Sequence, residues 1–279
     1  MRTEPVPLSA SSSGLSGACT GLVKIYWSAS GEVHALKGID AVFPAGVISA
    51  VVGPSGSGKS SLLRILACID RPTAGQVRVG DVDVSTLGAA RRRGVRRRLI
   101  GYMFQRPSDN LISYLTAEEH LGMAARLRGK ADGDARELLE RLGLGGRADH
   151  RPAQLSGGEQ QRLALASAVI GSPALVVADE PTAELDSGSG TTLMDLVAHL
   201  AGRGTGFVIA THDPIVMKAA DRILSLRHGA LEAETREDRA LAVIDASGRI
   251  QLSPDALTLF PDRRAVVTLV DGHVRITPP

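Results

Sequence analysis

The hydrophobic positions of the chain follow two alternating patterns, which together predict a sheet covered by helices. Short apolar runs bounded by Gly, Pro or acidic residues are typical of buried strands, and they occur in VISAVVG, ALVVA and FVIATHD. Apolar residues at helical spacing predict helices in KSSLLRILACID, 116–128, 133–143, 159–170 and 188–202. Because buried strands alternate with helices, we expect an α/β fold with a mainly parallel sheet.

Other segments predict further strands. GLVKIYW and VHALKGIDAVFPAG are typical of short strands broken by Gly and Pro, and GQVRVGDVDVS alternates like an antiparallel strand with a turn. DPIVMKAA has a helical pattern, and RILSLRHGALEAE predicts a closing hairpin. Residues 1–18 are rich in Ser, Pro and Gly, so we expect a disordered leader and a main domain over 19–235. Residues 236–279 alternate again around DASG and VDGH turns and predict a small β-rich appendage.

Composition narrows the class of protein. The 279 residues are 43% hydrophobic and 22% charged, which is typical of a compact globular chain. The net charge of +2 gives no general attraction to nucleic acid, and the two cysteines lack the spacing of a disulfide framework or a zinc site. We also find no apolar run long enough to span a bilayer and no signal peptide, so we expect a cytoplasmic chain that is neither inserted nor secreted by its own signals.

The segment GPSGSGKS matches the whole G-x-x-x-x-G-K-[ST] pattern of a phosphate-binding loop. A buried strand precedes it and a helix follows, so backbone N–H groups and the helix N-terminus would converge on one anion. Lys59 would place its charge on the outer phosphates, and Ser60 would offer a hydroxyl to Mg²⁺. These flanks argue against a simple glycine turn with a surface lysine. The candidate ATP-binding residues here are Gly53, Pro54, Ser55, Gly56, Ser57, Gly58, Lys59, Ser60 and Ser61.

An acidic pair follows the buried strand ALVVA. We expect Asp179 to bind Mg²⁺ directly or through water, and Glu180 to orient or deprotonate the attacking water. Taken alone, such a pair is as often a polar loop, but beside a phosphate-binding loop it indicates hydrolysis.

The segment LSGGEQQR places a second set of glycines at the start of a helix. Ser156, Gly157 and Gly158 would present backbone amides and a hydroxyl where the helix dipole favours an anion. A simpler interpretation makes Ser156 the N-cap and Glu159 its capping-box partner. Both interpretations can be true, because a capping box explains Ser156 and Glu159 but gives no reason for the two glycines.

Together these motifs resemble the ATP-binding subunit of ATP-binding-cassette (ABC) transporters over roughly residues 20–235. The resemblance implies a P-loop NTPase fold with a RecA-like core, an antiparallel β subdomain and a helical subdomain at about 106–168, here with a C-terminal β appendage. HALKGID, LIGYMFQ and HRPAQLSGGEQQR are similar to the macrolide-exporter and lipoprotein-releasing branch. In this family two such domains meet head to tail, so the signature segment would act on the partner's ATP. That segment is Leu155, Ser156, Gly157, Gly158 and Glu159.

The resemblance also implies roles for single residues. Tyr26 would stack on adenine, Gln105 would contact Mg²⁺ and relay to the membrane partner, and His212 would hold the γ-phosphate. Leu185 and Asp186 would cross the dimer interface. The implied catalytic set is Lys59, Gln105, Glu180 and His212, and the implied metal ligands are Ser60, Gln105 and Asp179.

The function implied is an ATPase subunit that binds ATP and Mg²⁺, dimerises, and drives a separate integral membrane permease at the cytoplasmic face of the membrane. Its partner ATPase is a second copy or a homologous subunit; both halves of the ATP site are intact, so a homodimer suffices. One alternative is a signalling or cell-wall-regulating complex that moves no substrate. Another is a DNA-maintenance ATPase, but only about fifty residues separate Gln105 from Ser156, too few for the insertions of that class. A translation factor of this superfamily is a further alternative, but such proteins usually carry two ATP-binding heads, whereas this sequence contains one nucleotide motif.

Two features remain outside these motifs. The arginine run, RRRGVRRR from Arg91 to Arg98, favours a solvated helix face over contacts with an acidic membrane partner, anionic lipid or nucleic acid. No aromatic residue interleaves with it, and we expect no nucleic-acid partner. The C-terminal segment weakly resembles swapped-hairpin β modules of bacterial transcription regulators, and we hypothesise that it aids dimerisation.

Overall fold

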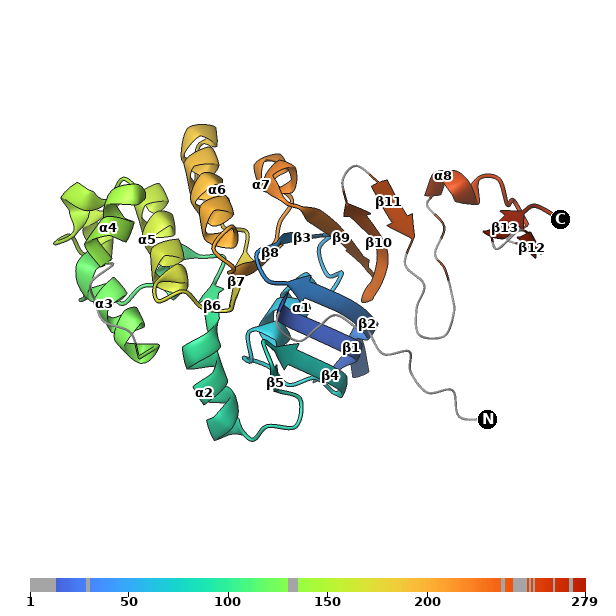
Figure 1. Ribbon diagram of the computed structural model, residues 1–279, viewed down its shortest axis with the longest axis horizontal. Coiled ribbons are helices and arrows are strands. Elements are labelled where there is room, and N and C mark those ends of the chain that lie inside the picture. The colour runs from blue at the N-terminus through green and yellow to red at the C-terminus, as the bar shows by residue number, and fades with distance from the viewer. Residues whose placement is uncertain are drawn as a thin grey trace.

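A seven-stranded sheet forms the centre of the protein in the computed structural model (Figure 1). The structure describes residues 14–28, 31–129, 135–236, 239–242, 250, 252, 254–262, 264–270 and 273–279. Five parallel strands, in the order β9-β3-β8-β7-β6, carry the antiparallel β10 and β11 at one edge, which confirms the α/β class. These strands are β3 (Ile48–Val52), β6 (Ile100–Met103), β7 (Leu175–Asp179), β8 (Gly206–Ala210), β9 (Arg222–Arg227), β10 (Ala230–Arg236) and β11 (Arg239–Ala242).

A second, antiparallel sheet has the order β2-β1-β4-β5. Its strands are β1 (Leu15–Ser28), β2 (Gly31–Pro44), β4 (Ala74–Val79) and β5 (Val82–Asp83). The strand β1 begins before the expected boundary at Cys19, so residues 15–18 are not a leader; residues 1–13 lie outside the described part. The backbone of β1 packs closely against both sheets here, because a Cβ on Gly17 would lie 3.4 Å from both Arg78 O and Leu175 Cδ2.

The helix α1 (Lys59–Leu66) packs between the two sheets, with Leu62, Leu63, Ile65 and Leu66 buried. Side chains from both sheets join α1 in one hydrophobic core, so the phosphate loop before α1 is anchored on both sides. Cys19 and Cys68 are buried in this core as free thiols. Burial raises the pKa of Cys19 to about 12 and that of Cys68 to about 11.

The other face of the large sheet packs against helices, which form the second hydrophobic core. The helices α3 (Ala117–Leu127), α4 (Ala135–Arg141) and α5 (Gly157–Val169) lie between β6 and β7 in sequence and at the left of Figure 1. The helices α6 (Ser187–Ala201) and α7 (Pro214–Ala219) follow β7 and β8. Short 3₁₀ turns occur at η2 (Pro107–Asp109), η4 (Gly145–Arg147) and η5 (Pro152–Gln154). The expected start of α4 at residue 133 lies outside the described residues.

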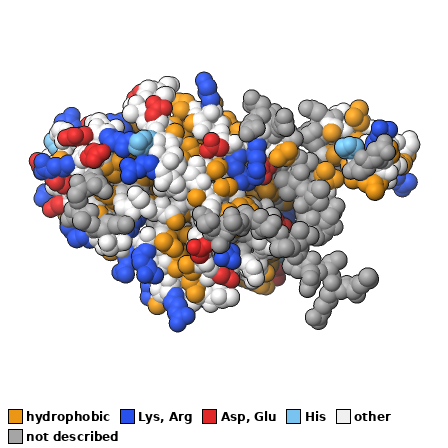
Figure 2. Space-filling view, viewed as in Figure 1, with side chains coloured by type: hydrophobic (Ala, Val, Ile, Leu, Met, Phe, Trp, Pro, Cys, Tyr) orange, Lys and Arg blue, Asp and Glu red, His pale blue; other side chains and the backbone are white. Residues whose placement is uncertain are grey.

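The arginine run forms the helix α2 (Ala89–Leu99), which projects at the bottom of Figure 1. Arg91, Arg93, Arg97 and Arg98 are exposed, and basic side chains gather over this helix in Figure 2. Arg92 is buried, however, and its Nη2 donates to Cys68 O at 3.1 Å and to Asp70 O at 2.6 Å. The expectation of a fully solvated face is therefore wrong for Arg92, which ties α2 to the loop after α1.

The expected boundary at residue 236 cuts through the main sheet, because β11 pairs with β10. Beyond it the structure describes a short α8 (Pro254–Leu257) and a hairpin of β12 (Val266–Val270) and β13 (His273–Thr277). Within the described residues, no helix has the length and apolar character that crossing a membrane requires.

Candidate functional site

A cavity of about 670 Å³ lies where β3, β7 and β8 end. It collects every residue predicted for nucleotide, metal and water, although they come from distant parts of the sequence. Its lining residues are Tyr26, Val33, His34, Ala35, Gly53, Pro54, Ser55, Gly56, Ser57, Gly58, Lys59, Ser60, Ser61, Gln105, Asp179, Glu180 and His212. The position agrees with the general rule that α/β sheets bind ligands beyond the carboxyl ends of their strands.

Two glycines give the phosphate loop (Gly53–Ser60) its shape. Gly53 and Gly58 have φ angles of +151° and +107°, which favour glycine. A Cβ on Gly53 would lie 2.0 Å from Leu226 O, and one on Gly58 would lie 2.4 Å from Ala35 O. The loop therefore fits against β9 and β2 only without side chains at these positions, and it delivers Lys59 and Ser60 to the first turn of α1.

Lys59 and Ser60 leave the loop in different directions. Lys59 Nζ donates to Gly53 O at 2.6 Å and to Pro54 O at 3.2 Å, so its ammonium group lies over the rim of the loop. Ser60 Oγ donates to Asp179 Oδ2 at 2.9 Å. Burial raises the pKa of Asp179 and the charge of Glu180 adds to this, whereas the Ser60 hydrogen bond and Lys59 oppose it. A hydroxyl beside a carboxylate is an oxygen donor set that fits Mg²⁺.

Glu180 lies at the end of β7, held by residues that follow the neighbouring strand β8. Its carboxylate accepts hydrogen bonds from Thr211 Oγ1 at 3.0 Å and His212 Nδ1 at 2.7 Å, and the side chain is 11% exposed. Its φ of +48° is unusual for a non-glycine residue, and its N–H donates to Ala210 O at 2.9 Å. The carboxylate is thus fixed in one orientation, whereas the His212 side chain is 86% exposed toward solvent.

Gln105 reaches the cavity from the loop after β6. Asn110 holds this loop: its Oδ1 accepts from Phe104 N at 2.7 Å, and its Nδ2 donates to Phe104 O at 3.0 Å and Arg106 O at 2.9 Å. These bonds bracket Gln105 on both sides. At the far end of the cavity lies Tyr26, whose hydroxyl donates to Asp70 Oδ2 at 3.1 Å.

The signature segment (Leu155–Glu159) does not line this cavity. Ser156 caps α5: its Oγ accepts from Glu159 N at 3.2 Å, while Glu159 Oε2 accepts from Ser156 N at 2.8 Å. The capping box is therefore present. The bonds from Ser156 and Arg147 lower the pKa of Glu159. The glycines have a packing reason as well, because a Cβ on Gly158 would lie 3.2 Å from Leu185 Cδ2, in the predicted interface loop.

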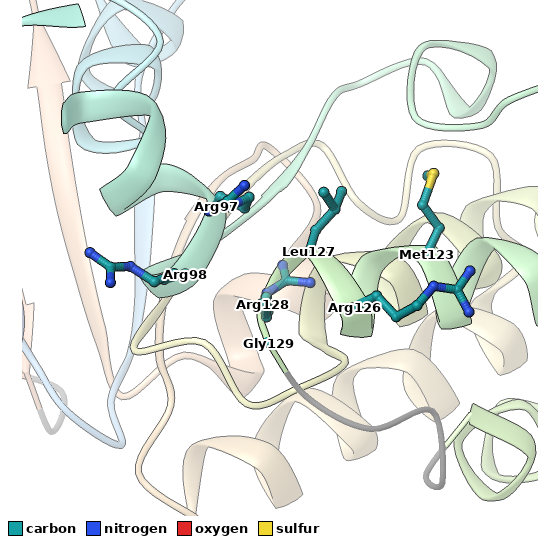
Figure 3. A pocket seen from close by; sticks show the side chains of 7 residues that line it. All are labelled: Arg97, Arg98, Met123, Arg126, Leu127, Arg128 and Gly129. Carbon is teal, nitrogen blue, oxygen red and sulfur yellow. The ribbon is translucent and has the colours of Figure 1, made fainter. Parts of the chain in front are cut away.

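A basic groove lies next to the loop that carries Gln105. Figure 3 shows the side chains that line its first hollow. Two adjoining hollows of about 370 Å³ and about 250 Å³ share the side chains of Arg97, Met123, Leu127 and Arg128. Arg97 and Arg98 come from α2, and among the described residues they have no acidic partner. Arg128 is tied down, since its Nη2 donates to Ala168 O at 2.9 Å.

Sequence reasoning missed several residues that order these groups. Thr211 and Asp213 flank His212, and Asp213 caps α7 and accepts from Thr182 Oγ1. Their place in ATHD, next to a predicted site residue, was an available signal. Gln161 lies within LSGGEQQR, so its place next to predicted site residues was also an available signal; it is buried on α5, and its Nε2 donates to Pro181 O at 2.9 Å, next to Glu180. Asn110 lies in no predicted motif, and no pattern in the sequence indicated its role.

Comparison with known proteins finds clear relatives. The family model for ABC transporters matches residues 36–183. The macrolide export ATP-binding/permease protein MacB 1 of Aeromonas hydrophila is 41% identical over 224 residues, or 78% of this chain and 34% of that protein. MacB of Salmonella paratyphi A is 43% identical over 210 residues, or 74% of this chain and 32% of that protein. The chain thus spans about a third of the length of these curated relatives.

Solved structures agree with these relatives. A dimeric, post-hydrolysis structure of the ATP-binding cassette MJ0796 bound to ADP and Pi has a TM-score of 0.75 and 34% identity. A second dimeric structure of the same cassette has a TM-score of 0.73 and 33% identity. Each match covers 81% of this chain and 100% of the other.

Proposed function

Because this chain belongs to the ABC transporter family of ATPases, we propose that two copies of it close around two ATP molecules and hydrolyse them. The observation that supports this most is the separation within one chain. The phosphate loop, Asp179, Glu180 and His212 line one cavity, whereas the signature segment begins a different helix outside it. An ATP site that needs both halves therefore requires a second chain. The dimeric cassettes among the similar structures support the same arrangement.

Within each site we assign complementary roles. The loop amides and Lys59 would stabilise the phosphate charge. Ser60, Asp179 and Gln105 would hold Mg²⁺, which supplies charge neutralisation on the phosphate oxygens when bound. Glu180 would orient and deprotonate the attacking water, because Thr211 and His212 fix its carboxylate. The His212 side chain is exposed and lines the cavity, so its ring would contact the outer phosphate. Tyr26 would stack on adenine.

A mixing experiment tests whether the site is shared between two chains. Lys59→Ala removes the phosphate contact, and Ser156→Arg places a bulky cation in the signature segment, so we expect each variant alone to lose ATPase activity. A mixed dimer joins the intact phosphate loop of the Ser156→Arg chain to the intact signature segment of the Lys59→Ala chain. Mixing should therefore restore activity, up to about a quarter of the wild-type rate, since about half the dimers would be mixed, each with one of two sites. Two variants that stay inactive together, or a Ser156→Arg variant that is fully active alone, would contradict a shared site.

We further propose a membrane permease as the driven partner, with this domain at the cytoplasmic face. The family and the permease segments named in the relatives support this assignment. The basic groove supports it too, because Arg97 and Arg98, which have no acidic partner among the described residues, lie beside the exposed Leu127 and next to the loop of Gln105. Such a groove fits an acidic, amphipathic cytoplasmic segment. Co-purification with a membrane protein, and its loss when Arg97 and Arg98 are both changed to Glu, would test the assignment.

Finally, we assign the C-terminal hairpin a role in self-association. On β12 and β13, Val267, Leu269 and Val274 are 65%, 77% and 66% exposed, and apolar side chains are prominent there in Figure 2. An isolated two-stranded hairpin is marginally stable, and exposed apolar patches typically mark contact sites. A second tail would cover this surface in the dimer that the ATP sites require.

A further inference from the structure

The predicted adenine contact, Tyr26, is held from two directions by side chains outside the cavity. Lys24 Nζ lies 4.7 Å from the centre of the Tyr26 ring, and it is fixed there because it also donates to Arg71 O at 2.8 Å. Asp70 accepts the hydrogen bond of the Tyr26 hydroxyl at 3.1 Å. The ring is therefore fixed both at one face and at its edge.

Asp70 is itself fixed to the helix that follows the phosphate loop. Arg64 on α1 donates to both of its carboxylate oxygens, from Nε at 3.0 Å and from Nη2 at 3.2 Å. This ion pair is the largest cause of the lowered pKa of Asp70, to which Tyr26 and Lys24 also contribute. Because Lys59 and Ser60 begin the same helix, the pair sets the position of the Tyr26 ring relative to the phosphate loop.

Lys24, Arg64 and Asp70 do not line the cavity, whereas Tyr26 does. They can therefore influence a bound nucleotide only through the ring or through long-range charge. Lys24 and Tyr26 both belong to β1, and the 4.7 Å contact places the Lys24 ammonium group over the Tyr26 ring. A cation over one face of an aromatic ring attracts it electrostatically and leaves the other face free for a base.

We propose that Lys24 and the Arg64–Asp70 pair are positioning residues that hold Tyr26 as a rigid stacking platform for the nucleobase. The inference rests on the proposed function, since it requires that Tyr26 contacts the base. Its particular consequence is that these residues control affinity for the base and not for the phosphates. A merely structural role, or a general effect of positive charge, would change both affinities together.

The test compares ligands with and without a base, using the full-length chain and isothermal titration calorimetry at constant Mg²⁺. ADP, CDP and inorganic pyrophosphate are suitable probes because none of them is turned over by hydrolysis. We expect Lys24→Met to raise the Kd of ADP about three- to tenfold, as estimated from the strength of such contacts. CDP should be affected less, because the pyrimidine stacks over a smaller area, and the Kd of pyrophosphate should stay within about twofold.

Matched variants separate the causes. Lys24→Arg should keep the affinity for ADP, because guanidinium groups also pack on aromatic faces. Lys37→Met removes one exposed lysine from the same sheet, away from Tyr26, and should change neither affinity. Asp70→Asn breaks the ion pair with Arg64 at nearly constant side-chain volume. This variant should bind ADP more weakly and pyrophosphate as tightly as wild type.

Two results would overturn the proposal: an unchanged Kd for ADP in Lys24→Met, or an equal loss of affinity for ADP and for pyrophosphate in that variant. Failure of the proposed function would look different. In that case the wild-type chain would not bind ADP, or Lys59→Ala would not weaken ADP and pyrophosphate together.

Discussion

The imidazole of His212 and the carboxylate of Glu180 face each other across 2.7 Å, from the ends of the neighbouring strands β8 and β7. Thr211 adds a second donor to the same carboxylate. The register that pairs Asp179 with Ala210 brings these groups together, so the sheet itself positions the candidate water-activating group.

We therefore expect Glu180→Gln to separate nucleotide binding from hydrolysis. The amide keeps the size of the side chain but cannot accept a proton from water. Loss of a general base typically costs a factor of about 10²–10⁴ in rate. ATP affinity, measured by equilibrium binding, should stay within a few-fold of wild type, and size-exclusion chromatography with MgATP should show an accumulated dimer. A turnover rate close to that of wild type would contradict the role given to Glu180.

Ser60 and Asp179 give a second prediction, which concerns the metal. Ser60→Ala removes a hydroxyl ligand and the hydrogen bond to Asp179, so the Mg²⁺ concentration for half-maximal ATPase activity should rise about tenfold. Ser55→Ala serves as the control, because Ser55 lies in the same loop and its side chain makes no hydrogen bond among the described residues. Equal Mg²⁺ dependence in the two variants would exclude Ser60 as a ligand.

The patterns that predicted this fold are local, and the residues that escaped prediction depend on tertiary contacts. The strands β3, β7 and β8 are mostly apolar rather than alternating, so their sequences alone indicate burial on both faces. The strand β6 has only four residues, one of which is Gly101, and it directly follows the helix that holds the six arginines. Its own sequence therefore gives little indication of a strand. It is a strand because Ile100 and Met103 pair with Leu175 and Ala178, and Gly101 is needed because its Cβ would lie 2.0 Å from Ala168 O.

The candidate site likewise combines residues that a local sequence pattern predicts with residues that only tertiary contacts bring together. The phosphate loop and its helix form one contiguous motif, so their chemistry can be predicted from spacing. The support of Tyr26 by Asp70 and Lys24 joins residues that no local pattern links, and the burial of Arg92 within an arginine run depends on two carbonyl acceptors in a distant loop. Such contacts follow from the packing of α1 between two sheets, which only the folded chain defines.

A third prediction concerns the C-terminal hairpin. A chain ending at residue 242 keeps β11 and hence the main sheet, so it should fold normally and keep its nucleotide binding. If the hairpin mediates self-association, this chain should dimerise at least about tenfold more weakly without nucleotide, as measured by sedimentation velocity. Leu269→Asp in the full chain should have the same effect, because it charges an exposed apolar position. Leu127→Asp, at an exposed position on α3, is the control. Unchanged association in both hairpin variants would remove the basis for this role.

The last prediction concerns pH and follows from His120, which is 2% exposed on α3. Its Nδ1 donates to Thr116 O at 2.7 Å, and its Nε2 accepts from Ile112 N at 2.8 Å. This arrangement requires the neutral ring, because a protonated ring could not accept the bond from Ile112. Burial lowers the pKa of His120 below its ordinary value of 6.5, while the Thr116 carbonyl and Glu119 oppose the shift.

Between the lowered folded-state pKa and 6.5, the unfolded chain binds more protons at His120 than the folded chain, so stability rises with pH in this window. The contribution is fully present above pH 6.5 and is lost as the pH falls below it, by at most about 1.4 kcal/mol per pH unit. His120→Gln removes this titration at some cost in packing. In urea unfolding at pH 7.5 and pH 5.5, wild type should therefore lose more free energy of unfolding on acidification than the variant. His150→Gln, an unburied histidine in the same helical region, should respond like wild type. An equal loss in wild type and His120→Gln would show that His120 is not responsible.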